Sequence, residues 1–96
     1  MRRISVSAAA KRDLLEIWSY IAADNIDAAD DFLGRIYARC NMFAEFSASG
    51  LRRDDLSPDL FGAPIGRHTI YYRVEPKRLI VSRILHSARQ IDTTYF

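Results

Sequence analysis

The sequence predicts a small α+β domain in the order β-α-α-β-β-β, with a helix hairpin packed on one face of a mostly antiparallel sheet. Two observations predict it. The first half of the chain spaces apolar residues three and four positions apart, as on one face of a helix. The second half, Ile65–Arg89, alternates β-branched and aromatic residues with polar ones around a turn at Glu75–Arg78, which is typical of a β-hairpin. Because helices and sheet each have one apolar side, each must cover the other.

Length and composition limit the class of protein. With 96 residues, of which 49% are apolar, we expect a single domain over residues 1–96 with one modest core. The only cysteine, Cys40, allows no internal disulfide and is expected in the core. Met1–Val6 has no apolar signal-peptide region, and no apolar run approaches the ~20 residues of a membrane span. These features predict a soluble, cytoplasmic protein with no membrane contact.

Positive charge is concentrated in the second half of the chain. Residues 1–48 hold 6 Lys/Arg and 7 Asp/Glu, a net charge of −1, and residues 49–96 hold 8 and 5, a net charge of +3. The whole chain carries only +2, so strong nonspecific binding to nucleic acid is not implied. The strand half is therefore the expected binding side for an acidic partner.

The first half begins with a short strand, Arg3–Val6, followed by Ser7 as a helix N-cap. We expect the first helix to end near Asp24–Asn25, with Asn25 in the left-handed C-cap conformation. Its predicted apolar stripe is Leu14, Ile17, Trp18 and Ile21, and its predicted exposed side is Lys11, Arg12, Asp13 and Glu16.

Asp27 is expected to cap the second helix, which should end before the break at residues 47–50. Its predicted stripe is Ala29, Phe32, Leu33, Ile36, Cys40, Phe43 and Phe46. The connection over residues 51–58 should be a solvated loop in which Arg52, Arg53, Asp54 and Asp55 pair with one another. A strand over residues 60–65 should be irregular or at an edge, because Pro64 has no amide donor.

The hairpin register decides which side chains share a face. With Val74 opposite Leu79, Tyr72 faces Val81, Ile70 faces Arg83 and His68 faces Leu85. The predicted core face then contains Ile70, Tyr72, Val74, Leu79, Val81 and Leu85. The other face is predicted to be basic and partly open, with Arg67, Thr69, Tyr71, Arg73, Ile80, Ser82, Ile84 and His86.

Several strings resemble the ParE branch of the RelE/ParE toxins. Residues 7–14 (SAAAKRDL) run into 17–21 (IWSYI), and residues 27–29 (DAA) open the second helix. The strongest part is residues 64–68 (PIGRH), continued by 70–74 (IYYRV) and 83–89 (RILHSAR). No single tripeptide is specific, but the ordered set covers nearly the whole chain. The resemblance implies the RelE/ParE fold over residues 1–96.

The resemblance also implies a function. Such a protein is the toxin of a bacterial type II toxin–antitoxin pair; ParE members act on DNA gyrase, and RelE members cut mRNA on the ribosome. We expect a ParE-like toxin that inhibits gyrase by binding, not by catalysis. Its partner would be a ParD-like antitoxin with a ribbon-helix-helix DNA-binding part and a C-terminal segment that folds onto the toxin. The complex would bind operator DNA only through the antitoxin. The alternatives are a ribosome-dependent mRNA endonuclease and a non-toxic corepressor subunit.

The sequence offers no cofactor or metal motif: His68 and His86 are far apart in the chain, and the glycines are scattered. A metal-free nuclease could use His86, Arg67, Arg73 and Arg83. However, the RelE-type lysine cluster is missing, since only Lys11 and Lys77 are present. We therefore expect no catalytic residue. Arg83, on the predicted core face, is expected either to extend past the helices to solvent or to pair with Glu16 or Asp13. The predicted partner-binding residues are Arg67, Arg73, His86, Arg89, Tyr95 and Phe96.

Overall fold

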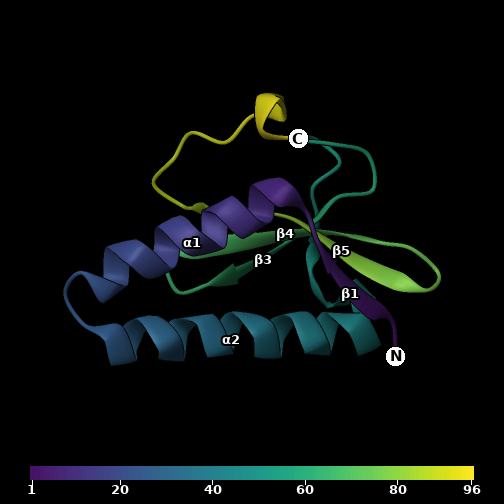
Figure 1. Cartoon of the computed structure of the whole chain (residues 1–96). Coiled ribbons are helices and arrows are strands. Elements are labelled where there is room, and N and C mark those ends of the chain that lie inside the picture. The colour runs from purple at the N-terminus through teal and green to yellow at the C-terminus, as the bar shows by residue number, and fades with distance from the viewer.

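The computed structural model describes residues 1–47 and 49–96 in full and residue 48 by its backbone alone. The elements are β1 (Arg3–Val6), α1 (Ala8–Ala22), α2 (Ile26–Glu45), β2 (Leu51–Arg52), β3 (Phe61–Ile65), β4 (His68–Val74) and β5 (Arg78–His86). Short 3₁₀ turns follow at Ser47–Ser49 and Thr93–Tyr95. The two long helices pack against the sheet, and the predicted α+β class is confirmed (Figure 1).

The five strands form one sheet in the order β1-β5-β4-β3-β2. β1 runs parallel to β5, and all other neighbouring strands are antiparallel. β1 pairs only with Arg78–Val81, so the rest of β5 has a strand neighbour on one side alone. β2 pairs with Phe61 and Gly62, which leaves the half of β3 containing Pro64 at an edge, as its missing amide predicts.

Side chains define where the helices begin. The Ser7 hydroxyl accepts a hydrogen bond from the Ala10 amide at 3.0 Å, which confirms the predicted N-cap. The second cap differs from the prediction, because Asn25 begins α2 by accepting from the Ala28 amide at 3.0 Å, and Asp27 lies inside the first turn. Asn25 has an extended backbone and does not close α1 in a left-handed conformation. Within the three-residue connection 23–25, Ala23 is the C-cap of α1 and Asn25 is the N-cap of α2.

The main core lies between the helix hairpin and the sheet. Tyr72 is fully buried there, and its ring stacks on Phe43 at 4.6 Å and on Phe61 at 5.3 Å. Its hydroxyl donates to the Ser47 carbonyl at 3.0 Å and accepts from the Gly50 amide at 2.9 Å. The other buried residues of this core are Ala10, Leu14, Ile36, Cys40, Ala63, Ile65, Ile70, Leu79, Val81 and Ile84.

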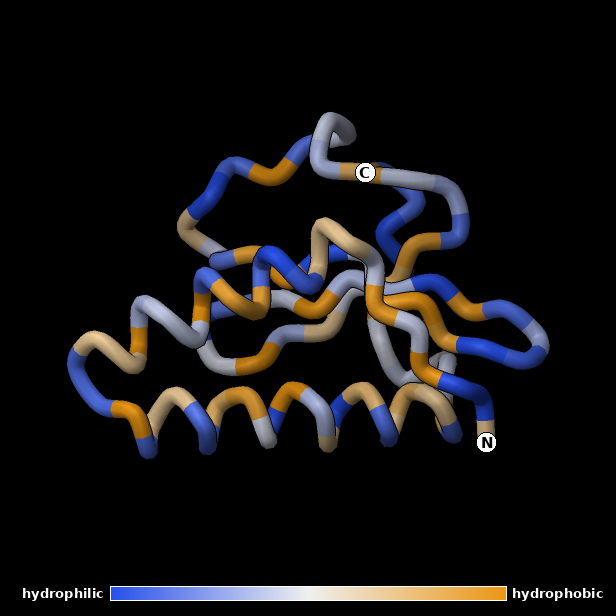
Figure 2. The backbone as a smooth tube through the Cα atoms, in the orientation of Figure 1, coloured by the Kyte–Doolittle hydropathy of each residue, from blue (hydrophilic) through white to orange (hydrophobic). Residues whose placement is uncertain are grey.

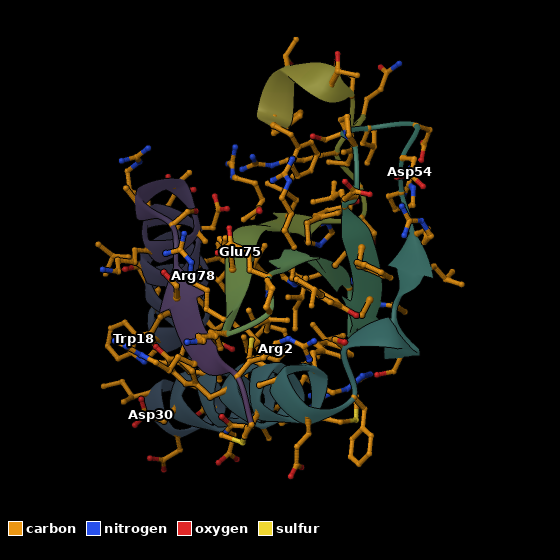
Figure 3. The ribbon with its side chains drawn as sticks, turned by 90° about the vertical axis from the view of Figure 1, so that its right-hand side faces the viewer. Arg2, Trp18, Asp30, Asp54, Glu75 and Arg78 are labelled. Atoms are coloured by element: carbon orange, nitrogen blue, oxygen red, sulfur yellow. The ribbon has the colours of Figure 1, made fainter. Side chains whose placement is uncertain are left out.

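Not every predicted core residue is fully buried. Trp18, Ile21 and Phe32 are only partly buried, and Phe46, just beyond the end of α2, is 65% exposed. The Trp18 indole lies at the rim between the helices, where its Nε1 donates to the Asp30 carboxylate at 2.9 Å (Figure 3). An indole with a polar partner fits a rim position better than a closed core.

A β-bulge at Ser82 changes the predicted register of the hairpin. Val74 lies opposite Leu79 and Tyr72 opposite Val81, as predicted, but Ser82 is an extra residue on β5. Beyond it Ile70 faces Ile84 and His68 faces His86, so the prediction for this half was wrong by one residue. Because a shift of one residue exchanges the two faces, Ile84 belongs to the helix-side core and Leu85 to the other face.

The outer face of the sheet was predicted to be partly open, and it is covered. Tyr71 and Leu85 are buried there in a second apolar cluster with Leu56 and Leu60. Ile91, Tyr95 and Phe96 of the C-terminal tail pack on the same cluster. Figure 2 shows the tail and the 53–60 loop on the side of the sheet opposite α2, each with apolar segments. The polar loop pairs its own charges as predicted, Arg52 with Asp54 at 2.8 Å and Arg53 with Asp55 at 2.9 Å.

Candidate functional site: the basic end of the sheet

Four basic residues meet at the end of the sheet where β4 begins and β5 ends. The Ser87 amide and hydroxyl both donate to the Arg67 carbonyl, at 2.8 and 2.9 Å. This double contact fastens the turn before β4 to the segment after β5. We call the resulting group, Arg67, His68, His86 and Arg89, the basic end. It brings together three of the six predicted partner-binding residues, which are separated in sequence by up to 22 positions.

Local backbone geometry positions these side chains. Gly66 has a φ of +58°, a left-handed conformation that glycine adopts without strain, so the chain turns sharply into β4. At the other side of the basic end, the Ala88 amide donates to Nδ1 of His86 at 3.0 Å, and the Arg89 amide donates to the His86 carbonyl at 3.1 Å. The second turn is therefore built around His86.

The two histidines lie directly across the β4–β5 pair. Their rings meet edge to face at 4.9 Å, and Phe32 of α2 lies 5.5 Å from the His68 ring. Burial lowers the pKa of His68 below its ordinary value, and the nearby His86 and Arg89 lower it further. Sequence reasoning did not select His68, because its predicted partner across the hairpin was Leu85.

Positive charge at the basic end comes mainly from Arg67 and Arg89. Both side chains are exposed. Within the described part of the chain, neither has a carboxylate oxygen within 4.0 Å. A guanidinium presents a planar fork of donors suited to carboxylate or phosphate. The basic end can therefore bind an anionic group of a partner.

A groove adjoins the basic end, between α1 and the last residues of β5. It has a volume of about 350 Å³ and is lined by Asp13, Glu16, Ile17, Tyr20, Ile84, His86 and Arg89. Tyr20 stands 84% exposed on its rim. His86 faces this groove because it lies two residues after Ile84, on the helix side of the sheet.

Asp13 closes the inner end of the groove. It was predicted to be exposed, but it is only 6% exposed. Its carboxylate accepts from Nε and Nη2 of Arg83 at 2.7 and 2.8 Å, and from the Ile84 amide at 3.0 Å. The predicted pairing of Arg83 with a helix carboxylate is therefore confirmed for Asp13. The hydrogen bonds offset the cost of burying this charge.

The other three predicted partner-binding residues lie on the outer face. Arg73 donates to the Ser82 hydroxyl at 2.9 Å and to the Ser57 hydroxyl. The Phe96 ring meets Tyr71 edge to face at 5.0 Å, and the Arg83 guanidinium lies 5.4 Å from the Tyr95 ring. The bulge therefore separates Arg73 from His86, and their predicted common face was wrong.

The described residues contain neither a cluster suited to a metal ion nor an activated thiol. Within residues 1–47 and 49–96, no three His, Cys, Asp or Glu side chains gather as they would around a metal ion. Burial raises the pKa of the Cys40 thiol to about 11, so it is a poor nucleophile at neutral pH. No helix in this part of the chain is long and apolar enough to cross a bilayer.

The helix hairpin on one face of a five-stranded sheet is the fold of RelE/ParE-type toxins. The chain belongs to the ParE family, because the family described as "ParE toxin of type II toxin-antitoxin system, parDE" matches residues 4–91. It is 29% identical to toxin ParE1 and 28% identical to toxin RelE3, both of Caulobacter vibrioides. The match to ParE1 covers 92% of this chain and 92% of ParE1. The match to RelE3 covers 91% of this chain and 96% of RelE3.

Solved structures share the fold. A chain of the chromosomal ParDE toxin–antitoxin system of P. aeruginosa matches with a TM-score of 0.73 at 18% identity, covering 90% of this chain and 96% of that one. A chain of the toxin–antitoxin complex RelBE2 of Mycobacterium tuberculosis matches with a TM-score of 0.55 at 19% identity, covering 88% of this chain and 96% of that one. The predicted fold is therefore confirmed, and the chain is a toxin of a type II toxin–antitoxin system.

Proposed function

We propose that this toxin arrests growth in the cytoplasm by binding DNA gyrase, and that a ParD-like antitoxin neutralises it. The observation that carries the proposal is the basic end, where Arg67 and Arg89 are exposed without a carboxylate partner in the described chain. Such a surface fits an acidic protein surface or the phosphates of gyrase-bound DNA. The family membership supplies the choice of gyrase as the target.

Binding rather than catalysis is supported by the outer face of the sheet. Arg73 and Arg83, the arginines available to a nuclease there, are held by serine hydroxyls and by Asp13. The apolar cluster of the 53–60 loop and the tail covers Tyr71 and Leu85 beside them. A metal-free ribonuclease needs an accessible base, acid and phosphate-binding cations. The covered outer face does not offer this set.

The mRNA endonuclease is the second candidate, because a toxin named RelE3 matches this chain about as well as ParE1 does. In that case His86 would be the expected general base or acid, since it is the one partly exposed imidazole facing a groove within the described residues. A non-toxic corepressor subunit, the third possibility from the sequence, predicts no growth arrest on expression.

The proposal includes a ParD-like antitoxin as the partner of this toxin. The fold neighbours come from solved toxin–antitoxin systems, which supports an antitoxin partner. The proposed ParD-like antitoxin supplies the contact with operator DNA through its own ribbon-helix-helix part. A small domain with strand edges and exposed apolar side chains gains stability from such a cover.

Induced expression with two parallel readouts tests the target. We expect filamentation and DNA-damage signalling, gyrase-dependent DNA breaks with purified toxin, and no codon-phased cuts by primer extension of cellular mRNA. Arg67→Glu with Arg89→Glu should abolish the breaks without changing the thermal midpoint. Lys77→Glu, at the β4–β5 turn on the opposite end of the hairpin, is the matched control and should remain toxic. Growth arrest with intact DNA and mRNA cuts that vanish in His86→Ala would establish the nuclease instead.

A further inference from the structure

The edge of β5 is open where it borders the groove. The Ser87 amide bonds the Arg67 carbonyl, and in an antiparallel ladder the hydrogen-bonded residues alternate. Ile84 and His86 therefore turn their backbone groups away from β4, as the bond from the Ile84 amide to Asp13 confirms. The His86 carbonyl already accepts a hydrogen bond from the Arg89 amide. The Ile84 carbonyl and the His86 amide therefore face away from β4, at two residues that line the groove.

From this geometry we infer that the open edge between Ile84 and His86 binds an extended segment of the antitoxin, which pairs with β5 and covers the basic end. The inference rests on the proposed antitoxin partnership. One residue of an added strand can donate to the Ile84 carbonyl and accept from the His86 amide, which is the pairing unit of strand addition. Asp13 limits the added strand in the direction of β1, because it already occupies the Ile84 amide.

The walls of the groove specify the chemistry of the segment. Ile17 and Ile84 line its floor, and Tyr20 stands 84% exposed at its rim on α1. An apolar side chain of the segment fits between them and covers the Tyr20 ring. Figure 1 shows α1 passing beside the point where the tail leaves the sheet, which is where the groove lies.

The charged residues of the groove specify the direction in which the antitoxin segment runs along it. Arg89 lines the groove together with His86, whereas Glu16 lies on the α1 wall. An acidic residue of the segment therefore belongs beside Arg89, beyond the apolar residue and away from Glu16. In that position it neutralises Arg89, one of the two arginines that we assign to the target, so antitoxin and gyrase exclude each other.

Other strand edges fit an added segment less well. At β3, Pro64 has no amide, and its carbonyl already accepts from Arg39 at 3.0 Å. β1 is also an edge strand, but the space beside it is lined mainly by the charged residues Arg3, Glu75, Lys77 and Arg78. The groove at β5 offers a strand edge, an apolar wall and the exposed Arg89 together.

The complex with the antitoxin encoded beside the toxin gene provides the test. Amide hydrogen exchange should show strong protection of His86 in the complex relative to the free toxin, with Ile4 and Val6 of β1 unchanged. Tyr20→Ala should weaken antitoxin affinity roughly 10-fold or more at an unchanged thermal midpoint. Leu15→Ala, a 65% exposed residue elsewhere on α1, is the matched control and should change affinity by less than about twofold.

An exchange of charges between toxin and antitoxin tests the direction in which the segment runs. Arg89→Glu should weaken the complex, and a Lys replacing an acidic residue of the antitoxin segment should restore it. Amide protection at Ile4 and Val6 instead of His86, or full antitoxin affinity of Tyr20→Ala, would overturn the proposed β5 site but not the antitoxin partnership. Failure of the neighbouring antitoxin to bind would overturn the antitoxin partnership and this inference together. A toxin that binds its antitoxin here but leaves gyrase untouched overturns only the target.

Discussion

Asp13 and Arg83 lie 70 positions apart and form a paired contact in which one carboxylate accepts two guanidinium bonds, at 2.7 and 2.8 Å. The same carboxylate also accepts the Ile84 amide. Arg83 in turn contacts the C-terminal tail, with its guanidinium 5.4 Å from the Tyr95 ring. One ion pair therefore joins the start of α1, the bulged half of β5 and the tail.

Removing Asp13 alone should be costly. Asp13→Ala leaves Arg83 and the Ile84 amide without their partner, and we expect a loss of roughly 3 kcal/mol in the free energy of unfolding. Replacing both partners with apolar residues of similar size, Asp13→Leu with Arg83→Met, should recover most of it, although the Ile84 amide stays unpaired. Urea unfolding of the three proteins measures both values. Equal losses in the single and double variants would show that the ion pair itself is the stabilising element.

The tail should stabilise the fold as well as meet partners. Deleting Tyr95 and Phe96 uncovers Tyr71 and Leu85 on the outer face, and we expect a loss of about 1–3 kcal/mol on urea unfolding. Phe96→Leu keeps an apolar side chain on Tyr71 and should lose less. A deletion that leaves the unfolding midpoint unchanged would mean that the tail does not stay on the sheet in solution.

Cys40 should report unfolding. Because burial raises its pKa from 9.0 to about 11, the native thiol stays protonated at pH 8 and should react slowly with a disulfide reagent. Labelling should accelerate with urea in step with the loss of circular dichroism. The same pKa difference means that stability is present below pH 9 and is lost as the pH rises toward 11, because the unfolded thiol ionises first. Rapid labelling of the native protein would contradict this burial.

His68 should make the protein less stable in weak acid. Its folded pKa is lowered by burial and by His86 and Arg89, so the unfolded state takes up a proton first as the pH falls below the ordinary value of 6.5. The free energy of unfolding should therefore fall between pH 7.5 and pH 5.5, and it should fall less in His68→Gln. Equal pH dependence of the two proteins would assign the effect to other groups.

The sequence by itself determined the order of the elements apart from β2, which was predicted as loop, and also the Ser7 cap, the helix stripes around Ile36 and Phe43, and the turn of the hairpin. These features depend on contacts between residues close in the chain, where spacing and capping chemistry are directly readable. The pairing of Arg83 with a carboxylate on α1 was also predictable, because an arginine on an apolar face needs a partner.

Only the tertiary structure decided the two faces of β5 beyond Ser82. The Ser82 carbonyl accepts from the Ser7 hydroxyl at 2.8 Å, and the Ser82 hydroxyl accepts from Arg73 at 2.9 Å. These bonds join residues up to 75 positions apart and accompany an extra residue that no alternation of side chains reveals. That one residue placed His86 opposite His68 and on the groove side of the sheet, whereas Arg73 lies on the outer face with Ser57 and Ser82, because the pleat of a strand exchanges its faces at every position.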